Sequence, residues 1–150
     1  MYAQILVPID GSPTSGQALS EATGLARMAH ARVRLLHILD PLEHTHGFES
    51  PEVYRRDVLP GARRAGEKLL QDAREQLVHE GIEVETELLE SLDARVAQLI
   101  VEQARQWRAD LIVLGTHGRR GIERALMGSD AEQVARTSPV PVLLVRYRAP

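Results

Sequence analysis

Short apolar runs alternate along this chain with segments whose apolar residues recur at helical spacing. The runs typical of strands cover residues 3–9, 33–39, 82–88, 111–114 and 142–145. Strands joined through a helix become parallel neighbours, because a parallel connection needs a long crossover. The alternation therefore predicts a single α/β domain over residues 1–150, with an open, doubly wound, five-stranded parallel sheet and helices on both faces.

The polarity of the runs indicates where each strand lies in the sheet. Residues 82–88 alternate apolar and acidic side chains, as a half-exposed edge strand does, whereas residues 111–114 are apolar throughout and suit the centre. We expect the strand order 3-2-1-4-5, which reverses between strands one and four. The last strand, residues 142–145, would then be an apolar edge, which predicts a homodimer paired through it.

The segment after the second strand is predicted to form a long loop. Residues 40–60 contain three prolines and show no sustained period, and the next helix is expected to begin near residue 62. His44 and His46 in this segment could bind a metal, but their spacing is not that of a structural zinc site. We therefore assign no metal ligands.

Composition and charge exclude several classes of function. The chain has no cysteine, so it has neither a disulfide framework nor a thiol nucleophile. Its net charge of -3 disfavours a nucleic-acid partner, and its apolar runs are too short to span a membrane. The N-terminus enters the first strand without a leader pattern, so we expect a cytoplasmic protein.

A glycine-rich stretch follows the fourth predicted strand. Gly115 and Gly118 are followed, after nine intervening residues, by Gly128 and Ser129 at the start of a helical segment. Glycines let backbone approach a ligand closely, and the N–H groups at a helix start favour anions. This pattern predicts a phosphate loop. A structural alternative stays open, because Ser129 and Glu132 have the spacing of a capping box and Gly115 could simply end a strand.

The point where the strand order reverses brings this loop opposite the end of the first strand. Ligands of open parallel sheets bind there, beyond the carboxyl ends of the strands. Asp10 would face Gly115 across the crevice, which suits a nucleotide. The glycine spacing matches neither a Walker A motif nor the dinucleotide fingerprint. Asp10 could also serve only as a partner of the following helix start.

These residues carry a family resemblance over essentially the whole chain. The motifs are ILVPIDGS at residues 5–12, LHILD at residues 36–40, ADLIVLG at residues 109–115 and the glycine spacing described above. They resemble the ATP-binding branch of the universal stress protein family. The resemblance implies a five-stranded Rossmann-like sheet, a homodimer and ATP as the ligand, with Mg²⁺ on its phosphates.

The resemblance also implies roles for individual residues. The adenine end would be contacted by Pro8, Asp10 and the backbone of Ile38. Gly115 would lie at the ribose. The phosphates would be held by Gly118, Gly128 and Ser129. Arg119 is a further candidate for the phosphates, with a solvated loop arginine as the alternative.

Three functions are compatible with these features. The first is a cytoplasmic ATP-binding stress or signalling module in which the nucleotide orders the glycine loop and alters a partner surface. The second is a slow Mg²⁺-dependent ATPase, although the sequence shows no evident base and no Walker-type lysine. The third is a dimeric, chaperone-like protein that does not use nucleotide. His37 and Trp107 are expected to be packing residues, and His117 could meet a phosphate or face solvent.

Overall fold

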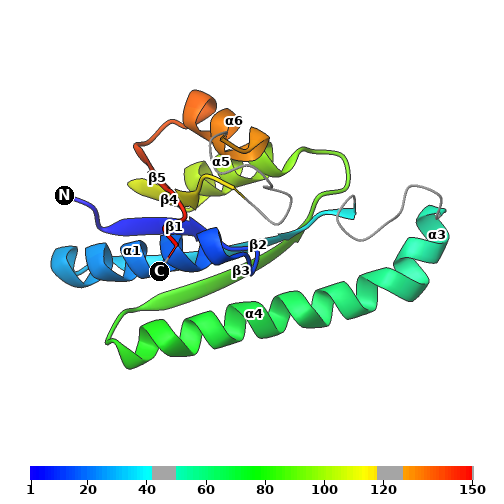
Figure 1. Cartoon of the computed structure of the whole chain (residues 1–150), viewed down its shortest axis with the longest axis horizontal. Coiled ribbons are helices and arrows are strands. Elements are labelled where there is room, and N and C mark those ends of the chain that lie inside the picture. The colour runs from blue at the N-terminus through cyan, green and yellow to red at the C-terminus, as the bar shows by residue number, and fades with distance from the viewer. Residues whose placement is uncertain (42–49, 118–126, 150) are drawn as a thin grey trace.

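The computed structural model describes residues 1–41, 50–117 and 127–149. Its sheet has five strands in the order β3-β2-β1-β4-β5, and each neighbouring pair is parallel (Figure 1). The strands are β1 Gln4–Pro8, β2 Arg32–Leu39, β3 Val84–Glu90, β4 Leu111–Gly115 and β5 Val142–Val145. The predicted strand order and fold class are confirmed.

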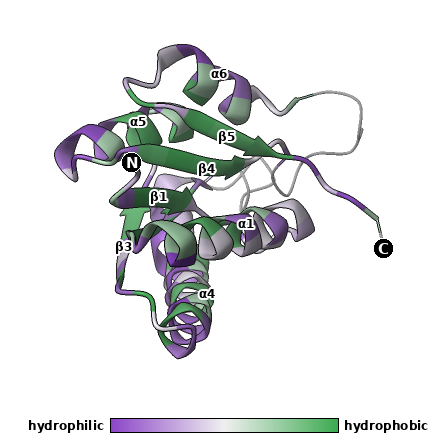
Figure 2. Cartoon of the chain, turned by 90° about the vertical axis from the view of Figure 1, so that its left-hand side faces the viewer, coloured by the Kyte–Doolittle hydropathy of each residue, from purple (hydrophilic) through white to green (hydrophobic). Residues whose placement is uncertain are grey.

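Helices cover both faces of this sheet. They are α1 Pro13–Ala29, α3 Pro51–Val53, the π-helical turn η1 Tyr54–Val58, α4 Leu59–His79, α5 Val96–Gln106 and α6 Ser129–Thr137. Figure 2 shows α1 and α4 on one side of the strands and α5 and α6 on the other. None of the helices in the described parts of the chain is long and apolar enough to span a membrane.

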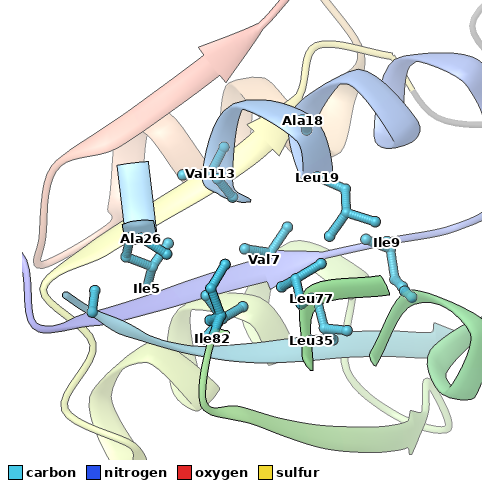
Figure 3. Close-up of a cluster of buried hydrophobic side chains, with 14 of the residues drawn as sticks. Ile5, Val7, Ile9, Ala18, Leu19, Ala26, Leu35, Leu77, Ile82 and Val113 are labelled. Atoms are coloured by element: carbon cyan, nitrogen blue, oxygen red, sulfur yellow. The ribbon is translucent and has the colours of Figure 1, made fainter. Parts of the chain in front are cut away.

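Alternate residues of the central strand supply the two cores. Ile5 and Val7 pack with side chains of α1 and α4, whereas Leu6 packs with side chains of α5 and α6. All three are fully buried. Figure 3 shows the first of these clusters, in which Leu77 of α4 and Ala18 of α1 face β1. Because both faces of β1 are covered, its sequence is apolar without alternation.

The start of α1 follows directly from the sequence. Ser12 caps the helix, and its Oγ accepts a hydrogen bond from Ser15 N at 3.2 Å. Pro13 occupies the first helical position, where its missing N–H leaves no bond unmade. The chain after β5 is held over α1, because the Gln17 side chain donates to Arg148 O at 2.8 Å and accepts from Arg148 N at 2.9 Å.

The predicted loop over residues 40–60 is wrong in its second half. Residues 51–79 are helical, with Ser50 as the cap and its Oγ accepting from Val53 N at 3.2 Å. Pro60 suggested a break, but it lies in the first turn of α4, directly after the π turn. A proline is tolerated in a first turn, because it has no N–H to donate. His44 and His46 lie outside the described residues.

One aromatic residue anchors the start of this helical segment. Tyr54 is only 7% exposed, and its hydroxyl is buried without a hydrogen-bond partner. Burial raises the pKa of Tyr54 above its usual value, and the Asp40 carboxylate raises it further. Tyr54 is thus the buried residue at the start of a helical segment whose other residues before Leu59 are partly or fully exposed.

The edge strand β3 is partly exposed along its whole length, as predicted. It begins two residues later than expected, because Gly81 at φ 80° turns the chain and Ile82 N still bonds to Leu77 O of α4. Glu90 at its end pairs with Arg63 of α4, and Glu85 pairs with Arg34 of β2.

At the amino-terminal ends of the strands, the side chains of Asp110 and Gln4 form a group of hydrogen bonds that we call the clasp. Asp110 Oδ2 accepts from Ala3 N at 2.7 Å and from Gln4 N at 2.8 Å. The Gln4 side chain donates to the backbone carbonyls of Trp107 and Arg108, both at 2.7 Å. These bonds tie the start of β1 to the turn between α5 and β4.

Beside the clasp, two arginines of β2 stack on Trp107. The guanidinium carbons of Arg32 and Arg34 lie 5.6 and 5.0 Å from the ring centroid. The Arg34 hydrogen bond also holds the pKa of the Glu85 carboxyl below its usual range. Trp107 is buried in the α5–α6 cluster, so its predicted packing role is confirmed.

Candidate functional site

A cleft of about 950 Å³ opens at the carboxyl ends of the strands. It lies where β1 and β4 adjoin, which is where the strand order reverses. The predicted binding residues that line it are Pro8, Asp10, Ile38, Gly115, Gly128 and Ser129. Gly118 and Arg119 lie outside the described residues. The structure thus brings six residues from four segments of the chain to one cavity.

Asp10 is fixed by the turn that joins β1 to α1. Its Oδ1 accepts from Ser12 N at 2.9 Å, and its own N–H donates to Ser15 Oγ at 3.1 Å. Gly11 adopts φ 82° in this turn, which favours glycine. Asp10 is therefore a partner of the α1 start, and its half-buried side chain also lines the cleft.

The ends of β1 and β2 form the neighbouring wall. Their pairing stops at Pro8 opposite Leu36, while β2 continues to pair with β3 as far as Leu39. Ile38 therefore lies past the last β1 pair and borders the cleft. His37 is buried and its Nδ1 lies 2.7 Å from Ile9 O, which confirms its predicted place in the core.

Gly115 is required by packing against α1. A Cβ at this position would lie 2.9 Å from Thr14 Cγ2 and 3.2 Å from the Thr14 carbonyl carbon. The sequence predicted ligand approach at this glycine, with a simple strand end as the alternative. In the structure, its missing side chain makes room for the first turn of α1. Through that contact, Gly115 brings the end of β4 close to the Asp10 turn.

Gly128 has a similar role at the other end of the loop. Its N–H donates to Thr116 O at 2.7 Å, and a Cβ at this position would lie 3.0 Å from the same oxygen. The absence of a side chain thus lets the start of α6 return onto the end of β4. Gly115 and Gly128 thus each allow a close backbone approach at the wall of the cleft.

The alternative interpretation of Ser129 and Glu132 as a capping box at the start of α6 is wrong. Gly128 is the cap residue, Ser129 is already helical, and no side chain caps this end. The Glu132 side chain pairs with Arg136 instead, at 2.7 Å. A helix start without a side-chain cap leaves N–H groups of its first turn available to water or to an anion. Asp130 and Glu132 in the same turn add negative charge nearby.

Thr116 and His117 follow β4 directly, and the sequence analysis did not predict that their side chains would contact each other. Thr116 is 3% exposed, and its N–H donates to Val145 O at 2.9 Å. Its Oγ1 lies 3.0 Å from His117 Nδ1. The other ring nitrogen of His117, Nε2, is buried without a hydrogen-bond partner. Leaving such a group unpaired costs about 1–3 kcal/mol, so the unpaired nitrogen needs an explanation.

The connection from β3 to α5 also lines the cleft and was not predicted. Ser91 N donates to Leu39 O at 2.8 Å, and Ser91 Oγ donates to Ala94 O at 2.5 Å. Leu92 at the cleft is 69% exposed, and the exposed Arg95 follows it. The sequence could have indicated this, because the carboxyl ends of all strands in a parallel sheet lie on the same side, and residues 91–95 directly follow the third strand.

Comparison with known sequences gives a consistent result over almost the whole chain. A sequence model of the Universal stress protein family matches residues 1–146. Universal stress protein MJ0531 of Methanocaldococcus jannaschii is 33% identical over 148 residues, covering 97% of this chain and 83% of that protein.

Solved structures agree with this assignment. The hypothetical protein MJ0577 superimposes with a TM-score of 0.84 at 26% identity, covering 100% of this chain and 99% of the other. A universal stress protein from Archaeoglobus fulgidus, solved in complex with dAMP, has a TM-score of 0.66 at 25% identity and covers 97% and 98% of the two chains. With its sheet order, its motifs and a family match from residue 1 to 146, this chain belongs to the universal stress protein family.

Proposed function

We propose that this protein binds an adenine nucleotide, ATP with Mg²⁺, in the cleft where β1 and β4 adjoin. The observation that carries the proposal is the meeting of Asp10 and Ile38 with the uncapped start of α6 around one cavity of about 950 Å³. Cavities of this size hold ligands as large as a nucleotide. The related structure in complex with dAMP supports an adenine ligand.

The adenine ring would lie at the Asp10 end of the cleft. The second carboxylate oxygen of Asp10 can accept from the adenine amino group, while Oδ1 is used by Ser12 N. Guanine carries a carbonyl at the matching position, so a carboxylate there disfavours it. Pro8 and the backbone of Ile38 would complete this end, and Gly115 would border the ribose.

The phosphates would lie against the start of α6, between Gly128 and Ser129. Mg²⁺ takes oxygen ligands, which the phosphates supply, and the Ser129 hydroxyl and Asp130 carboxylate belong to the same wall. The donor set therefore fits the ion. Gly118 and Arg119 are further candidates for the phosphates.

We propose a binding module rather than an ATPase as the role of the site. The lysine of the chain, Lys68, lies on α4 and pairs with Asp72 at 2.9 Å, so it is not at the cleft. In the proposed role, the nucleotide alters a surface read by a partner in the cytoplasm. Release of phosphate from ATP at more than a trace rate would instead favour the slow Mg²⁺-dependent ATPase.

Two measurements test the ligand. Mass spectrometry of material extracted from freshly purified protein should identify an adenine nucleotide, and calorimetry should give tighter binding of ATP than of GTP. A protein without nucleotide and without affinity for ATP would favour the nucleotide-independent, chaperone-like alternative.

Asp10→Asn tests the adenine end more sharply. Asparagine keeps one oxygen for Ser12 N but replaces the second oxygen with an amide nitrogen, which cannot accept a hydrogen bond. We expect about a tenfold loss of ATP affinity, which is about 1.4 kcal/mol, with unchanged melting temperature. Asp72→Asn, on the exposed face of α4, is the matched control. Equal ATP affinities of Asp10→Asn and the parent would remove Asp10 from the binding site.

We further propose that the protein is a homodimer paired through β5. Val142 and Leu144 pack on the α5–α6 cluster, whereas Leu143 is 37% exposed at this sheet edge. Light scattering at micromolar concentration should give twice the chain mass of 16.7 kDa. Leu143→Asp should shift the mass towards one chain while preserving the fold. A parent protein that is monomeric throughout this range would contradict the dimer.

A further inference from the structure

The side chain of His117 is held on one side and left without a partner on the other. Nδ1 lies 3.0 Å from the buried Thr116 hydroxyl, while Nε2 is buried and has no hydrogen-bond partner. His117 lines the cleft, and a Cβ at Gly128 would lie 3.7 Å from His117 Cα. The backbone of His117 is thus next to the cap residue of α6, and the residue lines the end of the cleft proposed for the phosphates.

The backbone around Thr116 fixes where the ring can be. Thr116 N donates to Val145 O at 2.9 Å, and Thr116 O accepts from Gly128 N at 2.7 Å. Both backbone groups are therefore engaged, and the residue itself is 3% exposed. A hydroxyl on so rigid a segment is a good anchor for one nitrogen of the ring.

The hydroxyl suits either protonation state of the ring. It can donate to Nδ1 when the imidazole is neutral, which places the proton on Nε2, and it can accept from Nδ1–H when the ring is charged. In these two forms Nε2 carries a hydrogen and is a donor. A neutral ring with its hydrogen on Nδ1 would instead make Nε2 an acceptor, and a phosphate oxygen beside Nε2 favours the two donor forms. A buried donor with no acceptor in the ligand-free chain is expected to gain one when an anion binds.

We propose that His117 Nε2 donates a hydrogen bond to a phosphate oxygen of the bound nucleotide, with Thr116 as its positioning residue. This inference rests on the proposed function. Because Nε2 is shielded from water in the ligand-free chain, binding must shift the ring or its surroundings so that the nitrogen meets the phosphate. His117 would then make the cleft prefer nucleotides that carry phosphate over the bare nucleoside.

Substitution of His117 by glutamine or asparagine distinguishes the roles of its two ring nitrogens. Glutamine places its NH₂ group near the position of Nε2, whereas asparagine reaches only as far as Nδ1. His117→Asn should therefore weaken ATP binding about tenfold and leave adenosine binding unchanged, and His117→Gln should recover most of the ATP affinity. Thr116→Val keeps the shape of the anchor and removes its hydroxyl, so it should weaken ATP in the same selective way by a smaller factor. His79→Asn, exposed at the end of α4, is the control.

Calorimetry with ATP and adenosine on these variants, in the presence of Mg²⁺, distinguishes the outcomes. A parent protein that binds neither ligand would overturn the proposed function and this inference together. A parent that binds ATP, with His117→Asn binding it equally well, would overturn the inference alone. Equal losses of ATP and adenosine in His117→Asn would assign the residue a structural role and also overturn it.

A measurement on the parent protein removes any dependence on how the variants fold. In protein labelled with ¹⁵N in its histidines, the Nε2 resonance of His117, assigned by its absence from His117→Gln, should shift when ATP is added and stay in place when adenosine is added. A resonance that ignores ATP under saturating binding would contradict the contact.

Discussion

The two ends of the parallel strands use polar groups in opposite ways. At the amino-terminal ends, Asp110 and Gln4 form hydrogen bonds within the chain and join β1 to the turn before β4. At the carboxyl-terminal ends, α6 starts without a side-chain cap, and His117 Nε2 is buried without a hydrogen-bond partner. The comparison suggests that the amino-terminal end stabilises the fold and that the carboxyl-terminal end keeps hydrogen-bond donors available for a ligand.

The largest expected effect comes from breaking the clasp. Asp110→Ala removes the acceptor of two backbone N–H groups, those of Ala3 and Gln4, so we expect unfolding to become easier by about 2–3 kcal/mol. Urea denaturation followed by circular dichroism measures this change. ATP affinity below the transition should stay at the parent value. If Asp110→Ala lost ATP affinity while keeping the free energy of unfolding of the parent, the two ends of the strands would not have separate roles.

An intermediate effect is expected at the carboxyl-terminal ends of the strands, where Gly115 both contacts α1 and lines the cleft. Gly115→Ala places a methyl group against Thr14, so it should destabilise the fold by about 1–2 kcal/mol and widen the cleft wall. Gly24→Ala in α1 is the matched control, because a Cβ there meets nothing within 4 Å. It should stabilise the helix by about 0.5–1 kcal/mol. Equal stabilities of the two variants would remove the proposed contact between β4 and α1.

The smallest effect should appear in the pH dependence of stability. The pKa of Glu85 is lowered by Arg34 in the folded chain, so the stabilisation from this pair is present above the unfolded pKa and is lost as the pH falls through the folded pKa. Because the Glu85 side chain is 38% exposed, we expect only about 0.5 kcal/mol. Glu85→Gln should be less stable than the parent at pH 7 and equally stable near pH 3. A difference that persists in acid would assign the effect to packing.

Much of the fold could be predicted because it depends on local patterns. The apolar runs, the half-polar run at the β3 edge and the Ser12 cap are each readable within a few residues of sequence. The strand order was narrowed by the polarity of the runs, which places residues 82–88 at an edge and residues 111–114 in the centre, and by the few arrangements that parallel crossovers allow. The convergence of Asp10 and Gly115 on one cleft follows from that order.

The features that sequence reasoning missed depend on contacts between distant segments. The role of Gly115 is set by Thr14, about a hundred positions earlier, and the burial of His117 is a property of the folded loop. The spacing of Ser129 and Glu132 left a capping box open as an alternative, and the folded chain uses Gly128 as the cap residue. Pro60 looked like a helix breaker, because the π turn before it has no signature of its own in the sequence.

The π turn at residues 54–58 also predicts how the chain would respond to the loss of one residue. A π turn holds about one residue more than the α-helical turn it replaces, because its hydrogen bonds join residues five positions apart rather than four. Deleting one residue within 54–58 should therefore restore a regular helix without moving α4. Each helical residue turns the chain by about 100°, so Tyr54 would swing away from the interior. Natural variants one residue shorter here should accordingly lack an aromatic residue at position 54.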